Sequence, residues 1–149
     1  MSVADRLPPF EQTIGAVLIA AKEAVIAPLR PILREFNVTE PQWRVMRVVN
    51  DRAPIDATSI AEIGQLRAPS VTRILRELED RGLIERAADE NDRRRALVVL
   101  SKEGQEMVNA SAQRMLYIMS EYSNRFGAQR LEQLTDELRA LSSAVGDIK

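Results

Sequence analysis

Apolar residues at helical spacing run through most of this chain. Between Phe10 and Phe36 they recur in steps of one, three or four residues, which predicts a long amphipathic helix. Pro28 and Pro31 lack an amide donor, and each ring crowds the carbonyl four residues earlier. The pattern therefore predicts a helix that is kinked or broken at the two prolines.

A second helix is predicted directly after this one. Thr39 can cap a helix, and Gln42 stands three residues later, as in a capping box. Pro41 suits the first helical turn. These signals predict a helix over residues 41–50, followed by a turn at 51–54.

Two further short helices follow, separated by a turn. The first is predicted over residues 58–64, with Ile60 and Ile63 facing inward. Residues 65–68 form the turn, and Pro69 fits the first turn of the next helix.

The helix that begins near Pro69 is strongly two-faced. Its apolar residues lie on one side: Val71, Ile74, Leu75 and Leu78. The other faces carry side chains suited to base edges and phosphates: Ser70, Thr72, Arg73 and Arg76. Gly82 is expected to end the helix in a left-handed conformation.

A basic hairpin is predicted after Gly82. Residues 83–86 and 97–100 have the composition of strands, and the tip between them carries Asp92-Arg93-Arg94-Arg95. A helix for one groove followed by a basic hairpin for the backbone or the minor groove is typical of a winged helix-turn-helix. The segment therefore predicts binding to double-stranded DNA.

The last third of the chain is predicted to form two long helices with heptad seams. Ser101 is expected to cap the first, which runs to about Phe126, and the second follows Gly127. The two seams consist of Val108, Ala112, Met115, Met119, Tyr122 and Phe126, and of Leu131, Leu134, Leu138, Leu141, Val145 and Ile148. Two seams and a long N-terminal helix exceed what one small lobe can cover, which predicts a homodimer.

The fold class expected from this order is mainly α with a small β-hairpin wing. All 149 residues would form one domain. Helices at about 8–36 and 102–148 would serve dimerisation, and a winged helix-turn-helix lobe would occupy about 39–100.

Composition excludes several classes of function. The chain has no cysteine and no histidine, which excludes thiol chemistry, zinc–thiolate sites and a Ser-His-Asp triad. The six glycines form no phosphate-binding loop. We therefore expect no enzyme, no cofactor and no metal. The sequence has no secretory signal or membrane span, so we expect a cytoplasmic protein.

The net charge of −1 gives no general affinity for nucleic acid, so basic charge must be local. The three arginines of residues 93–95 supply it. An isolated basic triplet would be read as a solvated turn, but the flanking helix and strands favour DNA binding.

The order of helices, the segment VTRILRELEDRGLIER, the DRRR loop and the following LSKEG resemble the MarR family of winged helix-turn-helix regulators. The resemblance covers essentially the whole chain. The segment LRPILREFNVTEPQWRVMRVV is more particularly similar to the homoprotocatechuate group, which regulates operons for aromatic-acid catabolism.

The resemblance implies a homodimeric repressor that binds a palindromic operator. The helix residues facing DNA would be Pro69, Ser70, Thr72, Arg73 and Arg76. Many relatives have a serine where Arg67 stands, so the usual hydroxyl cap is missing and Arg67 would reach a phosphate instead.

In the wing, the family's Asp-x-Arg pattern falls on Asp92 and Arg94. Asp92 would hold the Arg94 guanidinium for insertion into the minor groove. Arg93 and Arg95 would contact phosphates. The alternatives are an ordinary surface ion pair and, for the whole chain, a helical dimerisation or adaptor protein whose winged helix binds other proteins.

Family members commonly lose DNA affinity when a small aromatic acid or a phenolic compound binds. Arg44 and Arg47 share one side of a helix beside Trp43 and could hold a carboxylate and its ring, with help from Arg30. The alternatives are that Trp43 is a core or interface residue and that the arginines bind phosphates or carboxylates or are solvated.

Overall fold

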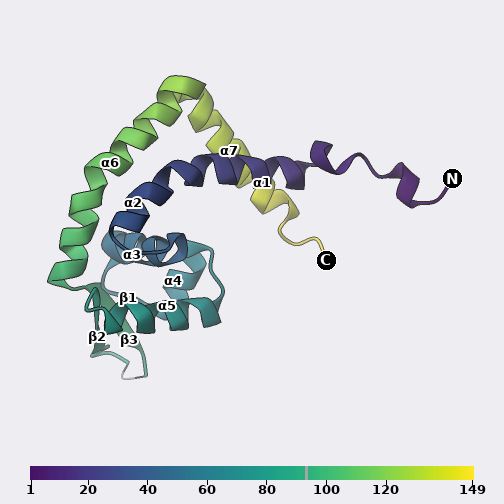
Figure 1. Cartoon of the computed structure of the whole chain (residues 1–149). Helices are drawn as coiled ribbons and strands as arrows, with labels where there is room; N and C mark the ends of the chain where they lie inside the picture. The colour runs from purple at the N-terminus through teal and green to yellow at the C-terminus, as the bar shows by residue number, and fades with distance from the viewer. Residues whose placement is uncertain (93) are drawn as a thin grey trace. The chain divides into compact units, whose positions relative to one another are not determined.

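The computed structural model describes residues 1–92 and 94–149. The chain divides into two compact units, Met1–Ala110 and Ser111–Lys149. Helix α6 (Lys102–Phe126) runs from the first unit into the second, which also contains α7 (Ala128–Val145). Figure 1 labels the helices α1–α5 and the three strands of the first unit. In chain order the elements before α6 are η1 (Ala4–Arg6), η2 (Phe10–Gln12), α1 (Ile14–Ile26), η3 (Ala27–Leu29), α2 (Arg30–Glu35), α3 (Glu40–Arg52), β1 (Ile55–Asp56), α4 (Ala57–Gly64), α5 (Ala68–Asp80), β2 (Ile84–Ala88) and β3 (Ala96–Leu100).

The N-terminal helix is broken where the two prolines predicted it. A single 3-10 turn, η3, contains Pro28 and separates α1 from α2. The α-helix begins at Ile14, so the expected start at Phe10 is wrong. The reason is local, because the Thr13 hydroxyl accepts a hydrogen bond from the Ala16 amide and thereby caps the helix.

Helices α3, α4 and α5 pack against one another and against the sheet. The predicted capping box at the start of α3 is present: the Thr39 hydroxyl accepts from the Gln42 amide, and the Gln42 side chain accepts from the Thr39 amide. The core of this lobe consists of apolar side chains that are essentially buried, among them Val45, Met46, Val49, Ile60, Val71, Ile74, Leu75, Leu78 and Val98. The helices are therefore held mainly by burial of apolar surface.

One prediction about the core was wrong. Ile60 is fully buried, as expected, but Ile63 leaves 45% of its surface exposed. Gly64, next to it, is the buried residue at the end of α4. The short helix ends directly afterwards at Gln65, which has a left-handed backbone with φ 53°. The inward face of α4 therefore continues through Ala61 and Gly64.

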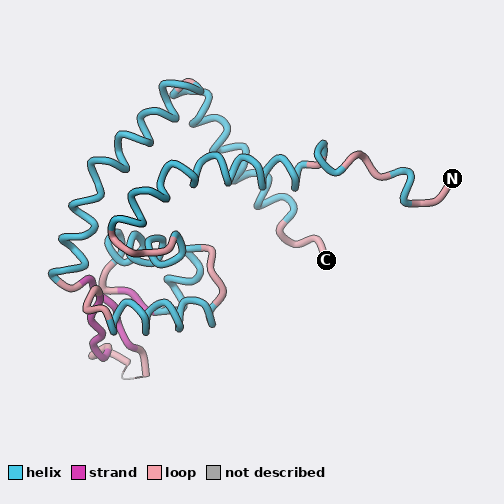
Figure 2. The backbone as a smooth tube through the Cα atoms, in the orientation of Figure 1, coloured by secondary structure: helices cyan, strands magenta, loops and turns pink. Residues whose placement is uncertain are grey.

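The strands form a three-stranded antiparallel sheet in the order β1-β3-β2 (Figure 2). The hairpin of β2 and β3 was predicted, whereas the edge strand β1 was not. Strand β1 is two residues long and pairs Ile55 with Val98 and Asp56 with Leu97. Gly82 ends α5 in the predicted left-handed region, with φ 72°. This arrangement is a winged helix-turn-helix.

The start of α6 contacts the backbone that joins α5 to β2. The Ser101 amide donates to the Leu83 carbonyl at 3.0 Å, and the Ser101 hydroxyl caps α6 by accepting from the Gly104 amide at 3.0 Å. A Cβ at Gly104 would lie 2.0 Å from the same Leu83 oxygen. The first turn of α6 therefore lies directly against the backbone between α5 and β2.

The second unit consists of the remainder of α6 and of α7. Gly127 separates them with φ 101°, a conformation that favours glycine. Within residues 1–92 and 94–149, no helix has the length and apolar character needed to cross a membrane.

Candidate nucleic-acid interface

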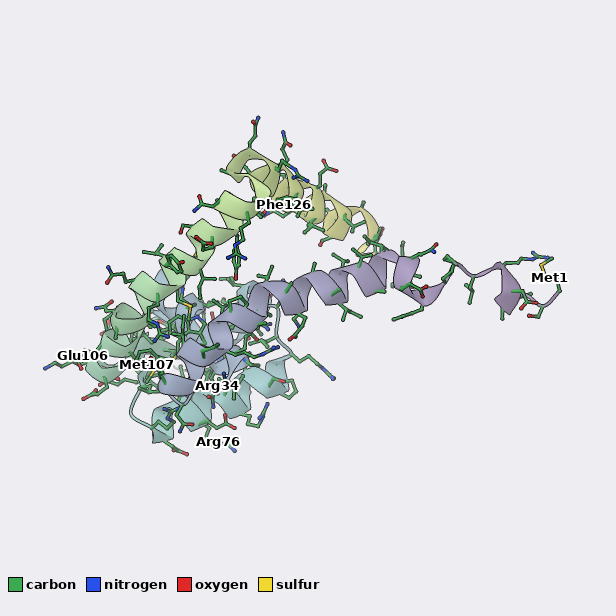
Figure 3. All side chains as sticks on the ribbon, turned by 45° about the horizontal axis from the view of Figure 1, so that its top comes forward. Met1, Arg34, Arg76, Glu106, Met107 and Phe126 are labelled. Carbon is green, nitrogen blue, oxygen red and sulfur yellow. The ribbon has the colours of Figure 1, made fainter. Side chains whose placement is uncertain are left out.

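Helix α5 buries its apolar face and leaves its polar face to solvent. The residues predicted to face DNA on this helix and at its N-cap are exposed, except for Ser70, which is half-buried: Arg67, Pro69, Ser70, Thr72, Arg73 and Arg76. Figure 3 labels Arg76 at the outer edge of the lobe. As expected, no side chain caps this helix at Arg67. Five of the six predicted residues are thus exposed on this helix and at its N-cap, and Ser70 is partly exposed.

A carboxylate connects this face to the start of α3. Glu77 lies 3.5 Å from the Arg73 guanidinium through Oε1, and its Oε2 accepts a hydrogen bond from Gln42 Nε2 at 2.8 Å. Gln42 is also the capping-box residue of α3. One glutamate therefore orients the most central arginine of α5 and joins it to the neighbouring helix.

The wing presents Arg94 on a short local scaffold. The Asp92 carboxylate accepts a hydrogen bond from the Arg94 amide at 3.0 Å, and the same oxygen lies 3.6 Å from Arg94 Nε. The Arg94 side chain is 95% exposed. Asp92 therefore holds the backbone of Arg94, while the guanidinium of Arg94 stays open to solvent. Arg93, which the sequence assigned to phosphate contacts, lies outside the described residues.

Arg95 is directed differently from Arg94. Its guanidinium lies 3.1 Å from Asp56 Oδ1, at the end of β1. Asp56 also accepts a hydrogen bond from the Ser59 hydroxyl at 2.6 Å. That hydrogen bond, together with the charge of Arg95, lowers the pKa of Asp56, so the carboxylate is ionised at neutral pH.

Sequence reasoning missed Asp56, Gln42 and Glu77 as parts of this surface. Two of them carried a readable signal: Glu77 stands four residues after Arg73, a spacing that favours ion pairs, and Asp56 stands three residues before Ser59, as at a helix start. The Gln42 contact had no such signal, because it joins two helices that are distant in sequence.

Two of the four residues predicted to bind a ligand, Trp43 and Arg44, are engaged within the lobe. The Arg44 guanidinium donates hydrogen bonds to both carboxylate oxygens of Glu40. Its Nη1 also donates to the carbonyls of Gly64 and Gln65, at 3.1 and 3.3 Å. Those carbonyls are at the C-terminus of α4, where a cation is favoured. Arg44 thus acts as a cap for a neighbouring helix.

The other three candidates have different surroundings. Trp43 is buried, with 7% of its surface exposed, which agrees with a core position. The Arg47 side chain is 48% exposed and lies 3.7 Å from Asp51. Arg30 is exposed and forms a two-pronged ion pair with Glu23 of α1. Arg30 and Arg47 are therefore the cations with surface open to a ligand.

Arg44→Ala is expected to lower the free energy of unfolding by about 1–3 kcal/mol, because it leaves the α4 carbonyls and Glu40 without their partner. Arg47→Ala is the matched control and should change it by less than about 0.5 kcal/mol, since its ion pair is exposed. Urea unfolding of both variants measures the difference. Equal stability of the two variants would contradict the capping role of Arg44.

Comparison with known proteins agrees with this geometry. The MarR family model matches residues 38–96. The homoprotocatechuate degradative operon repressor of Escherichia coli is 33% identical over 126 residues, which are 85% of each chain. The HTH-type transcriptional regulator FarR of Neisseria gonorrhoeae is 37% identical over 95 residues, 64% of this chain and 65% of that relative.

A solved structure is similar over nearly the whole length. NadR in complex with 4-hydroxyphenylacetate superposes with a TM-score of 0.79 at 29% identity, covering 96% of this chain and 99% of that one. The resemblance found in the sequence is thereby confirmed. The family match across the winged lobe and the identity to the Escherichia coli repressor show that this chain belongs to the MarR family of transcriptional regulators.

Proposed function

We propose that this protein is a homodimeric repressor that binds a palindromic operator in double-stranded DNA and is released by a small aromatic acid or phenol. Such a protein acts in the cytoplasm, where bacterial DNA is. The observation that carries the proposal is the exposed arginine face of α5 beside the solvent-open Arg94 of the wing. An α-helix enters the major groove, and an extended arginine fits the narrow minor groove.

The local distribution of charge supports DNA as the partner. The chain as a whole carries a net charge of −1, yet its exposed α5 face and wing present Arg67, Arg73, Arg76 and Arg94. Arginine is the side chain that most often reads guanine edges and enters narrow minor grooves. These four arginines place basic charge on the surfaces where a duplex would lie.

Exposed apolar residues support a second copy of the chain as the partner in a dimer. In the first unit they occur along η2 and α1 and include Phe10, Ile14, Val17 and Ile19. In the second unit they include Leu116, Tyr117, Met119, Leu134 and Ile148. Large side chains at helical spacing that stay open to water in one chain are typical of an interface between chains.

The relatives support an aromatic acid as the effector. The Escherichia coli relative is named as the repressor of a homoprotocatechuate degradative operon, and NadR was solved in complex with 4-hydroxyphenylacetate. Both names point to hydroxylated phenylacetates. Arg30 and Arg47 are the partly open cations that we assign to the carboxylate, with Trp43 near the start of the same helix as Arg47.

Hydroxylated phenylacetates, benzoates and cinnamates provide the test. A true effector at about 100 times its dissociation constant should stabilise the protein by about 2.7 kcal/mol, seen as a rise of several degrees in the melting temperature. The same compound should release the protein from DNA upstream of its own coding region in a gel shift. Arg30→Ala and Arg47→Ala should reduce the thermal shift, whereas exposed Arg139→Ala should not.

Two outcomes would count against the proposal. If the protein binds DNA but none of the acids raises its melting temperature, the protein is a repressor that does not respond to this class of ligand. A wild-type protein that binds none of the upstream DNA at low salt would favour an adaptor protein over a repressor.

A further inference from the structure

The base of the wing is closed by Arg95. Its carbonyl accepts from the Asp89 amide at 2.9 Å, and its own amide donates to the Asp92 carbonyl at 3.0 Å. These two hydrogen bonds close the loop that carries Arg94. Because Arg95 belongs to this closed turn, whatever holds its side chain also holds the loop.

The side chain of Arg95 is held by a well-anchored carboxylate. Asp56 keeps only 17% of its side chain exposed, lies opposite Leu97 in the sheet and accepts from the Ser59 hydroxyl. It also precedes α4 directly, where the helix dipole favours a negative charge. Arg95 is two residues from Leu97, so the ion pair is diagonal across strands β1 and β3.

A cavity of about 190 Å³ lies where the start of α4 faces the start of β3. Residues of both elements line it, and three of the lining side chains are arginines: Arg86, Arg94 and Arg95. Leu75 and Val98 line it as well, and both are essentially buried, so the cavity adjoins the apolar core of the lobe. Asp56 and Arg95 line the same cavity, so their ion pair lies beside open space near the wing turn.

We propose that Asp56 and Arg95 are positioning residues that fix the wing to the helices and thereby place Arg94 for the minor groove. Arg95 in this assignment contacts protein and not phosphate, unlike the phosphate contact expected for it from the sequence. The inference rests on the proposed function, since it concerns how that function's wing is held. In this assignment an acidic residue of the winged lobe strengthens DNA binding.

The test uses the sign of the charge effect. Removing a negative charge close to DNA ordinarily strengthens binding. Asp56→Asn should instead weaken binding to the upstream DNA about tenfold, because the wing loses its preorganised position. Glu90→Gln removes the same charge from an exposed wing residue and should leave binding unchanged or tighter. Asp56→Asn binding as tightly as Glu90→Gln would overturn the proposal.

A double-mutant cycle separates an ion pair from a phosphate contact. If the two residues act as one unit, Asp56→Asn combined with Arg95→Gln should bind no more weakly than the weaker single variant. The salt dependence should also stay unchanged in Arg95→Gln. If the slope of log K against log salt concentration falls by about 0.9 in Arg95→Gln, Arg95 contacts a phosphate and the proposed ion-pair role is overturned.

Hydrogen exchange supplies a readout that needs no DNA. The amides of Asp89 and Arg95, which close the turn, should exchange at least about fivefold faster in Asp56→Asn, while Ile84 and Leu100, at the far end of the hairpin, keep their rates. Unchanged exchange of the Asp89 and Arg95 amides would overturn the positioning role of the Asp56–Arg95 ion pair, even if the protein bound no DNA. If Asp56→Asn binds DNA as tightly as the wild type while Arg94→Ala binds more weakly, the positioning role of Asp56 and Arg95 is overturned and the proposed function stands.

Discussion

Gly104→Ala is expected to lower the free energy of unfolding by about 3 kcal/mol, although alanine is the better helix former. A Cβ at this position would lie 2.0 Å from the Leu83 carbonyl oxygen and 3.4 Å from Leu100 Cδ2. The oxygen belongs to the backbone and already accepts from the amide of Ser101, the residue that caps α6, so it cannot move without breaking that hydrogen bond. Urea or thermal unfolding at a fixed protein concentration measures the loss.

Gly15→Ala is the matched control for this substitution. Gly15 is also helical, in α1, and a Cβ there meets no atom of the chain within 4 Å. Here the helix propensity acts alone, and the variant should be as stable as the wild type or more stable by up to about 1 kcal/mol. Equal stability of the two alanine variants would show that α6 does not pack against Leu83 as described.

Arg94→Ala is expected to weaken binding to the upstream DNA by about 1–3 kcal/mol, roughly ten- to a hundredfold. The arginine is almost wholly exposed, and Asp92 holds its backbone, so the side chain has no large structural role to lose. The unfolding free energy should therefore stay within about 0.5 kcal/mol of the wild type. Quantitative gel shifts at two salt concentrations measure the loss of affinity.

Two further variants give this result its meaning. Arg139→Ala removes an exposed arginine from a comparable ion pair with Asp136, in the second unit, and should leave DNA affinity unchanged. Arg94→Lys keeps the charge but not the flat guanidinium, so it should recover only part of the lost affinity. Unchanged affinity in Arg94→Ala, with an unchanged salt dependence, would rule out a minor-groove role for the wing.

Features with a local cause could be predicted from the sequence. The capping box of Thr39 and Gln42, the left-handed Gly82, the cap at Ser101 and the break at Pro28 each depend on a few neighbouring residues, and each is present. The apolar face of α5 follows from its spacing alone. The winged helix-turn-helix was therefore readable from short segments taken in order.

Features that depend on a distant partner could not be predicted in this way. Strand β1 is two residues long and becomes a strand because Ile55 and Asp56 pair with β3. The interpretation of Arg44 as a ligand residue did not foresee its bonds to the carbonyls that end α4. In both cases the hydrogen-bonding partners are backbone groups that are distant in sequence, so the pattern of side chains along the chain does not predict these contacts.

The two oxygens of Glu77 contact side chains of two different helices. One holds Gln42 at the start of α3, and the other faces Arg73 on α5. A molecule that rearranged the first turn of α3 would release Gln42 from Glu77 and so change the position of the carboxylate beside Arg73. By thermodynamic reciprocity, DNA that drew Arg73 away from Glu77 would then change the affinity for that molecule by the same factor that the molecule changes the affinity for DNA. The strength of repression and the sensitivity to an effector would then be set together by a single carboxylate.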